Sequence, residues 1–189
     1  VSNCSSGEPN VEIDENDIAY LLYSSGTTGL PKGVMTTHRQ MVEIALNFIF
    51  AERLTHNNVI LTAFPAHWAG TLYSSILPCF YLGGTIVVLG EFSPQAVLEV
   101  IEREKVTNSF NLRQLIVSLL EYPQLNRYDF RSLRCVIIGG SPTPEKVLKQ
   151  AVATFGNIFM PFYGLVEQGP LTFLAPEEMV LERSEEMRR

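Results

Sequence analysis

The chain has 189 residues and 46% of them are hydrophobic, which is enough to build the core of one globular domain. Its 14 basic and 20 acidic residues give a net charge of −6, and no basic stripe is interleaved with aromatic residues. The chain therefore lacks the basic patch that nucleic-acid-binding proteins use, and this class of function is excluded. No apolar run approaches the roughly 18 to 20 residues that span a bilayer, so we expect no transmembrane segment.

The cysteines and histidines indicate neither a disulfide framework nor a zinc site. The cysteines are odd in number and two of them lie in apolar runs, which favours buried free thiols in a reducing, cytoplasmic compartment. The histidines are scattered without the spacing of zinc ligands. The first residues lack the basic start and apolar core of a secretion signal. The residues concerned are Cys4, Cys79, Cys135, His38, His56 and His67.

In chain order, residues 1–17 are polar and predict a linker or lead-in, and residues 177–189 predict a charged tail that is a solvated helix or a frayed end. Between them, residues 18–176 alternate short apolar runs with amphipathic segments. This alternation is typical of an α/β domain with layered helices on a largely parallel β-sheet. Strands are expected at 18–22, 34–37, 59–63, 85–89, 106–110, 133–138 and 158–162, and helices at about 38–53, 71–82, 112–120 and 144–155, with one more beginning at Ser93-Pro94.

The stretch from Ser24 to Gly33 has the composition of a phosphate cradle. Glycines let backbone amides approach an anion closely, while four hydroxyls and the Lys32 ammonium supply further donors. A run of this composition also occurs as an ordinary solvated turn. It is not a P-loop, because Gly33 stands where a Ser or Thr would hold magnesium. The candidate phosphate ligands are Ser24, Ser25, Gly26, Thr27, Thr28, Gly29 and Lys32.

Two further turns follow predicted strands. One is Gly139-Gly140-Ser141-Pro142, and the other is Tyr163-Gly164-Leu165-Val166-Glu167. Taken alone, the first is more often a plain strand-to-helix turn. Open α/β sheets bind ligands beyond the carboxyl ends of their parallel strands, so we expect one crevice there to collect all three turns.

The three turns, in this order, resemble the nucleotide motifs of the adenylate-forming superfamily, which includes acyl-CoA synthetases, luciferases and peptide-synthetase adenylation domains. The resemblance covers about residues 14–176, as part of the large N-terminal domain of such an enzyme. It implies that the first turn binds the ATP phosphates and that Gly139 to Pro142 lie along adenine. It also implies that Tyr163 packs on adenine and that Glu167 ligates Mg²⁺. Val166 departs from the family's threonine and loses a hydroxyl that contacts the α-phosphate.

The same resemblance gives His67 a place near the bound carboxylate. The family has an aromatic residue before this histidine, but this chain has Ala66. Trp68 and Gly70 are implied to line the acyl pocket. A lone histidine is more often a surface or packed residue, and Ala66 at the usual aromatic position weakens the functional interpretation of His67 further. For His38 the favoured interpretation is a helix-start residue.

The implied activity is that of an AMP-forming acid–thiol ligase. It joins a carboxylic acid, fatty or otherwise acyl, to ATP, releases pyrophosphate and passes the acyl group to coenzyme A. Lys32, Thr28, Glu167 and His67 are the implied catalytic residues. The family's Thr-Gly-Asp segment, hinge and C-terminal domain with a catalytic lysine do not occur before Arg189, so we expect that this chain alone does not form an adenylate.

Two other functions stay open at the level of sequence. Val166 and the missing segments favour a non-catalytic nucleotide-binding remnant, and an interaction domain without nucleotide is the other alternative. A kinase-like phosphotransferase is disfavoured, since the chain has no Walker lysine followed by Ser or Thr. The acyl chain length, the oligomeric state and membrane association are not readable from these residues.

Overall fold

The fold is seen in a computed structural model of the chain, in which residue 7 and residues 10–24, 30–90 and 92–179 are described. Six strands of this part form one sheet in the order β4-β3-β5-β6-β7-β8. All neighbours are parallel except β7 and β8, which pair antiparallel. The strands are β3 (Val59–Thr62), β4 (Thr85–Val88), β5 (Asn108–Asn111), β6 (Cys135–Ile138), β7 (Phe159–Leu165) and β8 (Gly169–Phe173).

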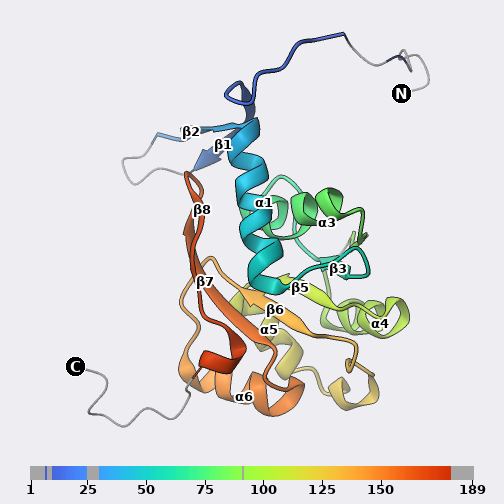
Figure 1. Ribbon diagram of the computed structural model, residues 1–189. Coiled ribbons are helices and arrows are strands. Elements are labelled where there is room, and N and C mark those ends of the chain that lie inside the picture. The colour runs from blue at the N-terminus through green and yellow to red at the C-terminus, as the bar shows by residue number, and fades with distance from the viewer. Residues whose placement is uncertain (1–6, 8–9, 25–29, 91, 180–189) are drawn as a thin grey trace.

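Helices cover both faces of this sheet, as Figure 1 shows. On one face lie α1 (His38–Glu52) and a helical stretch of three parts, α2 (Ala69–Thr71), the π-helical η1 (Leu72–Ile76) and α3 (Leu77–Leu82). On the other lie α4 (Pro94–Glu104), α5 (Arg113–Leu120) and α6 (Glu145–Phe155). Two short 3-10 turns are η2 (Leu125–Arg127) and η3 (Pro176–Glu178). The α/β prediction with layered helices on a largely parallel sheet is confirmed.

The central strand β6 reads as an apolar run because both of its faces are buried. In β6 all residues are buried, and they alternate between the two cores. Val136 and Ile138 pack with the α4, α5 and α6 side, whereas Cys135 and Ile137 pack with α1. One strand therefore joins two hydrophobic layers.

Local sequence signals account for several helix ends. The Ser93 side chain accepts a hydrogen bond from the Ala96 amide at 3.1 Å and Pro94 occupies the first turn of α4, as the sequence predicted. The predicted helix at 71–82 contains the π-helical turn η1, which the sequence analysis missed. Pro78 follows this turn, and a proline has no amide hydrogen and crowds the carbonyl four residues earlier, so a wider turn is accommodated there.

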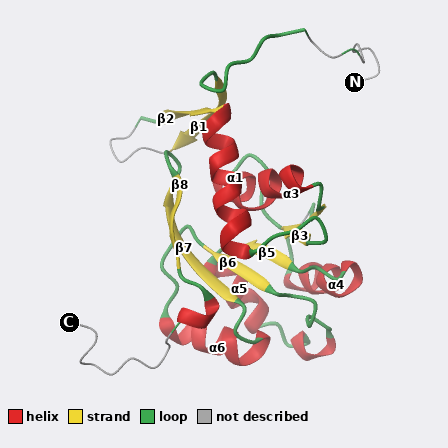
Figure 2. Cartoon of the chain, viewed as in Figure 1, coloured by secondary structure: helices red, strands yellow, loops and turns green. Residues whose placement is uncertain are grey.

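Two predictions about strands were wrong in part. The run at 18–22 does not join the parallel sheet but forms β1 (Ile18–Ser24), which pairs antiparallel with β2 (Lys32–Thr37). This hairpin stands beside the amino-terminal end of α1, apart from the main sheet (Figure 2). The strand β8 was not predicted, and its antiparallel pairing with β7 extends β7 beyond Phe162. The other predicted bounds differ from those of the structure by at most two residues.

The predicted division into lead-in, domain and tail stays a prediction, and the residues after Met179 lie outside the described part. Cys79 and Cys135 are buried free thiols, as predicted, while Cys4 lies outside the described residues. In the described part of the chain, no helix has both the length and the apolar character needed to cross a membrane.

Candidate functional site

The second predicted turn follows β6, and it lies beside the second half of β7. The third predicted turn is wrong in part, because Tyr163, Gly164 and Leu165 belong to β7 and only Val166 and Glu167 lie in the turn after it.

Strands β6 and β7 are parallel neighbours with Ile138 paired to Pro161, which brings the turn after β6 beside the rest of β7. Between them lies a cavity of about 420 Å³, and Tyr163 stands at it with 60% of its surface exposed. The cavity is lined by Ile138, Gly140, Ser141, Pro142, Thr143, Leu148, Pro161, Phe162, Tyr163 and Gly164. We call it the glycine-turn cavity.

Glycine is required at the turn after β6. A Cβ atom at Gly139 would overlap the ring of Phe162, and Gly140 has a φ of +79°, a conformation that other residues rarely adopt. The backbone can therefore run close to the Phe162 ring and leave the cavity open.

A second cavity of about 220 Å³ adjoins the first and is mostly apolar. The two cavities share Gly140, Phe162 and Gly164 as walls. This apolar cavity is further lined by Phe48, Trp68, Ala69, Gly70, Tyr73, Phe110, Leu112, Leu165, Val166, Gly169 and Pro170. Trp68 and Gly70 were predicted to lie there, whereas the ring residues from α1, β5 and β7 were not.

Aromatic rings give the apolar cavity its shape. Phe48 meets Phe162 edge to face with ring centroids 5.5 Å apart, and Phe110 lies 6.3 Å from Phe162. Trp68 stacks on Phe64 at 5.9 Å with an interplanar angle of 15°. Edge-to-face and stacked contacts of this kind stabilise each ring position by roughly 0.5 to 1.5 kcal/mol beyond area burial. The rings present a defined apolar surface for a flat ligand.

Val166 follows β7 and lines the apolar cavity, where it packs with the core cluster that contains Phe48 and Tyr73. Its methyl groups thus have an apolar environment at the position where the family motif has a threonine. Glu167 is exposed in the tight turn between β7 and β8, where the Gln168 amide donates to the Leu165 carbonyl at 3.3 Å. No group of three or more His, Cys, Asp or Glu side chains suited to a metal ion is found among the described residues.

The predicted phosphate loop connects β1 and β2, so it is a hairpin loop and does not follow a parallel strand. This corrects the expectation that all three turns follow strands of one parallel sheet. Ser24 pairs with Lys32 across the two strands, and Lys32 is exposed. The phosphate ligands predicted at Ser25, Gly26, Thr27, Thr28 and Gly29 lie outside the described residues.

The histidines take different places. The His67 residue is exposed in the turn between β3 and α2, and its carbonyl accepts a hydrogen bond from the Tyr20 hydroxyl at 3.4 Å. It does not line the apolar cavity, although the three residues after it do. His38 is the first residue of α1, immediately after the Thr37 cap, as its interpretation as a helix-start residue predicted.

Comparison with known proteins decides the family. The sequence profile described as AMP-binding enzyme matches residues 2–187. The chain belongs to the AMP-binding enzyme family. The recognition made from the three motifs is thereby confirmed.

Curated members of the AMP-binding enzyme family include CoA ligases. The chain is 30% identical to a feruloyl-CoA synthase of Amycolatopsis sp over 175 residues, which cover 93% of the chain and 35% of that protein. It is 36% identical to the 4-coumarate–CoA ligase CCL1 of Humulus lupulus, covering 86% of the chain and 31% of that ligase. The chain thus spans about a third of the length of these relatives.

Solved structures of the family share the fold. The N-terminal domain of FACL13 from Mycobacterium tuberculosis, bound to an inhibitor, superposes with a TM-score of 0.84 at 27% identity, over 94% of this chain and 44% of that one. ATP-bound MatB from Rhodopseudomonas palustris gives a TM-score of 0.85 at 24% identity, over 93% of this chain and 35% of that one. At that identity, the second likeness shows the fold alone.

Proposed function

We propose that the chain is the nucleotide- and acid-binding part of an AMP-forming acyl-CoA ligase. Such an enzyme joins a carboxylic acid to ATP, releases pyrophosphate and passes the acyl group to coenzyme A. The observation that carries the proposal is the pair of adjacent cavities with common walls at Gly140, Phe162 and Gly164. One cavity is bounded by the glycine turns and the other by aromatic rings, which suits a polar nucleotide next to an apolar acid.

In this proposal, adenine lies in the glycine-turn cavity along Gly139 to Pro142, with Tyr163 packed on its ring. The phosphates are bound by Lys32 together with the hydroxyl and amide groups of residues 24–29. Charge-assisted hydrogen bonds from such groups neutralise the phosphate charge and orient it for attack by the carboxylate.

The residues present fit a magnesium ion. This ion usually binds one or two protein carboxylates and fills its other coordination positions with phosphate oxygens and water. Glu167 is exposed in the turn after β7 and would hold it. When bound, the ion would supply charge neutralisation at the phosphates. His67 is proposed to lie near the reacting carboxylate, on the strength of the motif alone.

The apolar cavity favours a short or flat acid. Its volume of about 220 Å³ lies below the roughly 300 to 1,000 Å³ that is usual for pockets of drug-sized ligands. Aromatic rings around it offer edges and faces to a planar substrate. The names of the relatives, a feruloyl-CoA synthase and a 4-coumarate–CoA ligase, point to the same class of aromatic acids. A fatty acid of long chain is the less favoured substrate.

We propose that the thiol of coenzyme A accepts the acyl group, because the names of both relatives include CoA. The buried free thiols of Cys79 and Cys135 support a reducing compartment, and we propose the cytoplasm.

The first test is ATP binding by the 189-residue chain, measured by calorimetry with Mg²⁺ present. Loss of a charge-assisted hydrogen bond costs roughly 1.5 to 3 kcal/mol, so Lys32→Ala is expected to weaken ATP binding about 10- to 100-fold. Lys149→Ala is the control, because Lys149 is also partly exposed but pairs with Glu145 on α6, at 3.1 Å. Equal ATP affinity of the parent chain and Lys32→Ala would contradict the proposed phosphate site.

A nucleotide-binding protein without ligase activity is the second candidate, favoured by the apolar surroundings of Val166. Exchange of labelled pyrophosphate into ATP, measured with a short aromatic acid present, separates the two. We expect no exchange by the 189-residue chain alone, because it spans about a third of its relatives. Exchange by the chain alone would show that it adenylates without further segments.

A further inference from the structure

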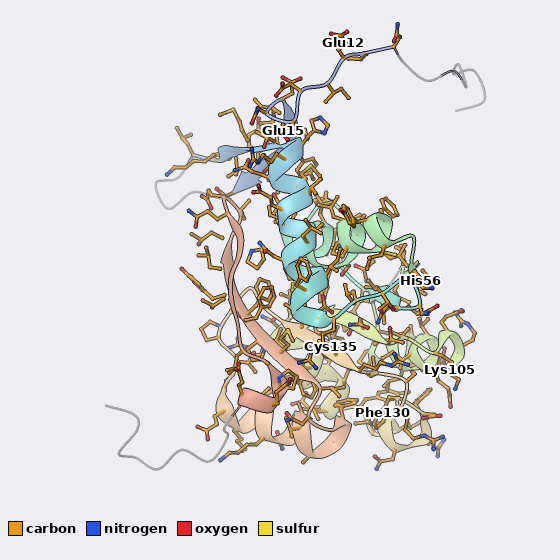
Figure 3. The ribbon with its side chains drawn as sticks, in the orientation of Figure 1. Glu12, Glu15, His56, Lys105, Phe130 and Cys135 are labelled. Carbon is orange, nitrogen blue, oxygen red and sulfur yellow. The ribbon has the colours of Figure 1, made fainter. Side chains whose placement is uncertain are left out.

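The hairpin of β1 and β2 carries Lys32, which the proposed function assigns to the ATP phosphates, and it forms a sheet of its own. Side-chain contacts must therefore set its direction relative to the two cavities. At the end where the chain enters and leaves the hairpin, Glu15 pairs with Arg39 at 3.3 Å; Figure 3 labels Glu15 there, beside the amino-terminal end of α1. Both side chains are exposed, and a surface ion pair of this kind contributes little.

A stronger attachment is found at one cross-strand pair of the hairpin, Tyr20 and Thr36. The Tyr20 hydroxyl donates to the His67 carbonyl at 3.4 Å. Thr36 Oγ1 lies 3.2 Å from the Tyr73 hydroxyl, and either oxygen can donate in this bond. The three residues that follow His67 line the apolar cavity, and Tyr73 lines it as well. The hairpin is thus bonded twice to the segment that forms one wall of that cavity.

The hydroxyl of Tyr73 serves this attachment and not the packing of the cavity. Among the described residues that line the apolar cavity, Tyr73 alone carries a hydroxyl group, and a phenylalanine would fill the same space with its ring. The partner of that hydroxyl is on β2. Tyr73 and Thr36 are each only 3% exposed, so water does not compete for their hydrogen bond.

Lys32 lies on the same face of β2 as Thr36. Residues two apart in a strand share a face, and this face holds the half-buried Val34, whereas Met35 on the other face is exposed. Four residues at about 3.3 Å each put Lys32 roughly 13 Å from Thr36 along the strand. A rotation of the hairpin by about 10° at Thr36 would therefore move Lys32 by about 2 Å, whereas binding groups work when they are held to within about 0.5 Å.

We propose that Tyr73 is a positioning residue for phosphate binding. Its ring forms part of the wall of the apolar cavity, and its hydroxyl holds β2 so that Lys32 stands at a fixed distance from that cavity. Because the hairpin is already ordered, less binding free energy is lost to ordering it when ATP binds. The inference rests on the proposed function, since it requires ATP phosphates at Lys32.

The test compares Tyr73→Phe with the parent chain by calorimetry, using ATP with Mg²⁺, adenosine and sodium benzoate as ligands. Loss of one net hydrogen bond changes an equilibrium constant roughly 2- to 10-fold, so ATP binding should weaken by about this factor. Adenosine has no phosphate and benzoate meets the ring, so both of these affinities should equal those of the parent. Tyr81→Phe is the matched control, because Tyr81 on α3 is 56% exposed.

A double variant separates positioning from stability. Tyr73→Phe alone leaves the Thr36 hydroxyl buried without its partner, which lowers the free energy of unfolding. Thr36→Val together with Tyr73→Phe replaces both partners by apolar groups of similar shape, which is nearly neutral for stability. Urea unfolding measures this. We expect the double variant to regain the stability of the parent and to keep the weakened ATP binding.

Recovery of ATP affinity in the double variant would overturn the inference and leave Tyr73 a structural role only. An equal loss of ATP and adenosine affinity in Tyr73→Phe, or no loss of ATP affinity, would overturn it as well. If Tyr73→Phe does not fold, the double variant decides.

Lys32→Ala distinguishes failure of the inference from failure of the proposed function. If Lys32→Ala binds ATP as the parent does, the proposed phosphate site is wrong and the inference is overturned with it. If Lys32→Ala weakens ATP binding and Tyr73→Phe does not, the inference alone is wrong.

Discussion

The two ends of the six-stranded sheet form cavities by different means. At the carboxyl ends of β6 and β7, glycines remove side chains, so that backbone and rings enclose open space. At the amino ends of β5 and β6, the side chains are present and polar, and Asn58, Asn108 and Glu52 are hydrogen-bonded to one another along a separate cavity of about 350 Å³. The first arrangement opens space beside the backbone, while the second buries the Glu52 carboxyl group, which accepts a hydrogen bond from Asn108.

The difference has an energetic consequence. A cavity made by glycines is sensitive to added volume, because any side chain there meets a packed ring or another strand. A cavity made by buried polar groups is sensitive to pH, because a charge without a partner is expensive to bury. Each end can therefore be altered without the other.

The largest expected effect is the pH dependence at Glu52. Between about pH 5 and 8 the folded chain keeps the Glu52 proton that the unfolded chain has lost, since burial raises its pKa from 4.5 to about 8. The free energy of unfolding should fall as the pH rises through this window, by at most about 1.4 kcal/mol for each pH unit. Urea unfolding of the parent and of Glu52→Gln at pH 5, 6, 7 and 8 measures it. The same pH slope in both proteins would show that Glu52 is not the group responsible.

The next effect concerns the glycine end. A Cβ at Gly164 would overlap the backbone carbonyl of Gly169, so Gly164→Ala should disturb the pairing of β7 with β8 and lower the free energy of unfolding by about 1 to 3 kcal/mol. Gly90→Ala is the matched control, because a Cβ there has open space. Its stability should equal that of the parent. The pH slope at Glu52 should be unchanged in Gly164→Ala, and a changed slope would mean that the two ends are coupled.

The smallest effect is expected at Val166. Val166→Thr returns the hydroxyl of the family motif, and one hydrogen bond to a phosphate oxygen should strengthen ATP binding by about 0.5 to 1.5 kcal/mol. The same hydroxyl faces the apolar cavity, so affinity for a short aromatic acid should not rise. Calorimetry with each ligand tests this. Val166→Ala is the control for altered packing, and an equal gain of ATP affinity in it would contradict the hydrogen bond.

Local signals predicted much of the fold. The Ser93-Pro94 start of α4 and the alternating apolar runs needed only neighbouring residues to be read. The strand β8 was missed because Gly169 and Pro170 resemble turn residues, and its pairing with β7 is a tertiary contact. The antiparallel pairing of β1 and β2 was missed because the glycine-rich stretch was interpreted as a turn at the end of a parallel strand. The connection between Ser24 and Lys32 is too short for the crossover that parallel neighbours need, so this length was a signal for a hairpin.

For the candidate site, Gly140 to Pro142 and Tyr163, which belong to two of the motifs, line one cavity. Phe48, Phe110 and Phe162 were not found, because aromatic cavity walls look like ordinary core residues in a sequence. The sequence analysis did not single out Glu52. Its burial depends on Asn108, 56 residues further along the chain, so only the folded structure reveals it.

Phe162 lines both cavities at the carboxyl end of the sheet, so the shape of one cavity depends on the shape of the other. Its ring borders both of them and is held in place by Phe48, Phe110 and Phe173. A ligand in one cavity that moves this ring changes the shape of the other cavity. Two ligands bound in the two cavities would then each change the other's affinity by the same factor, whichever of them binds first. If the proposed function holds, an acid of the wrong size would weaken the binding of the nucleotide before any bond is made.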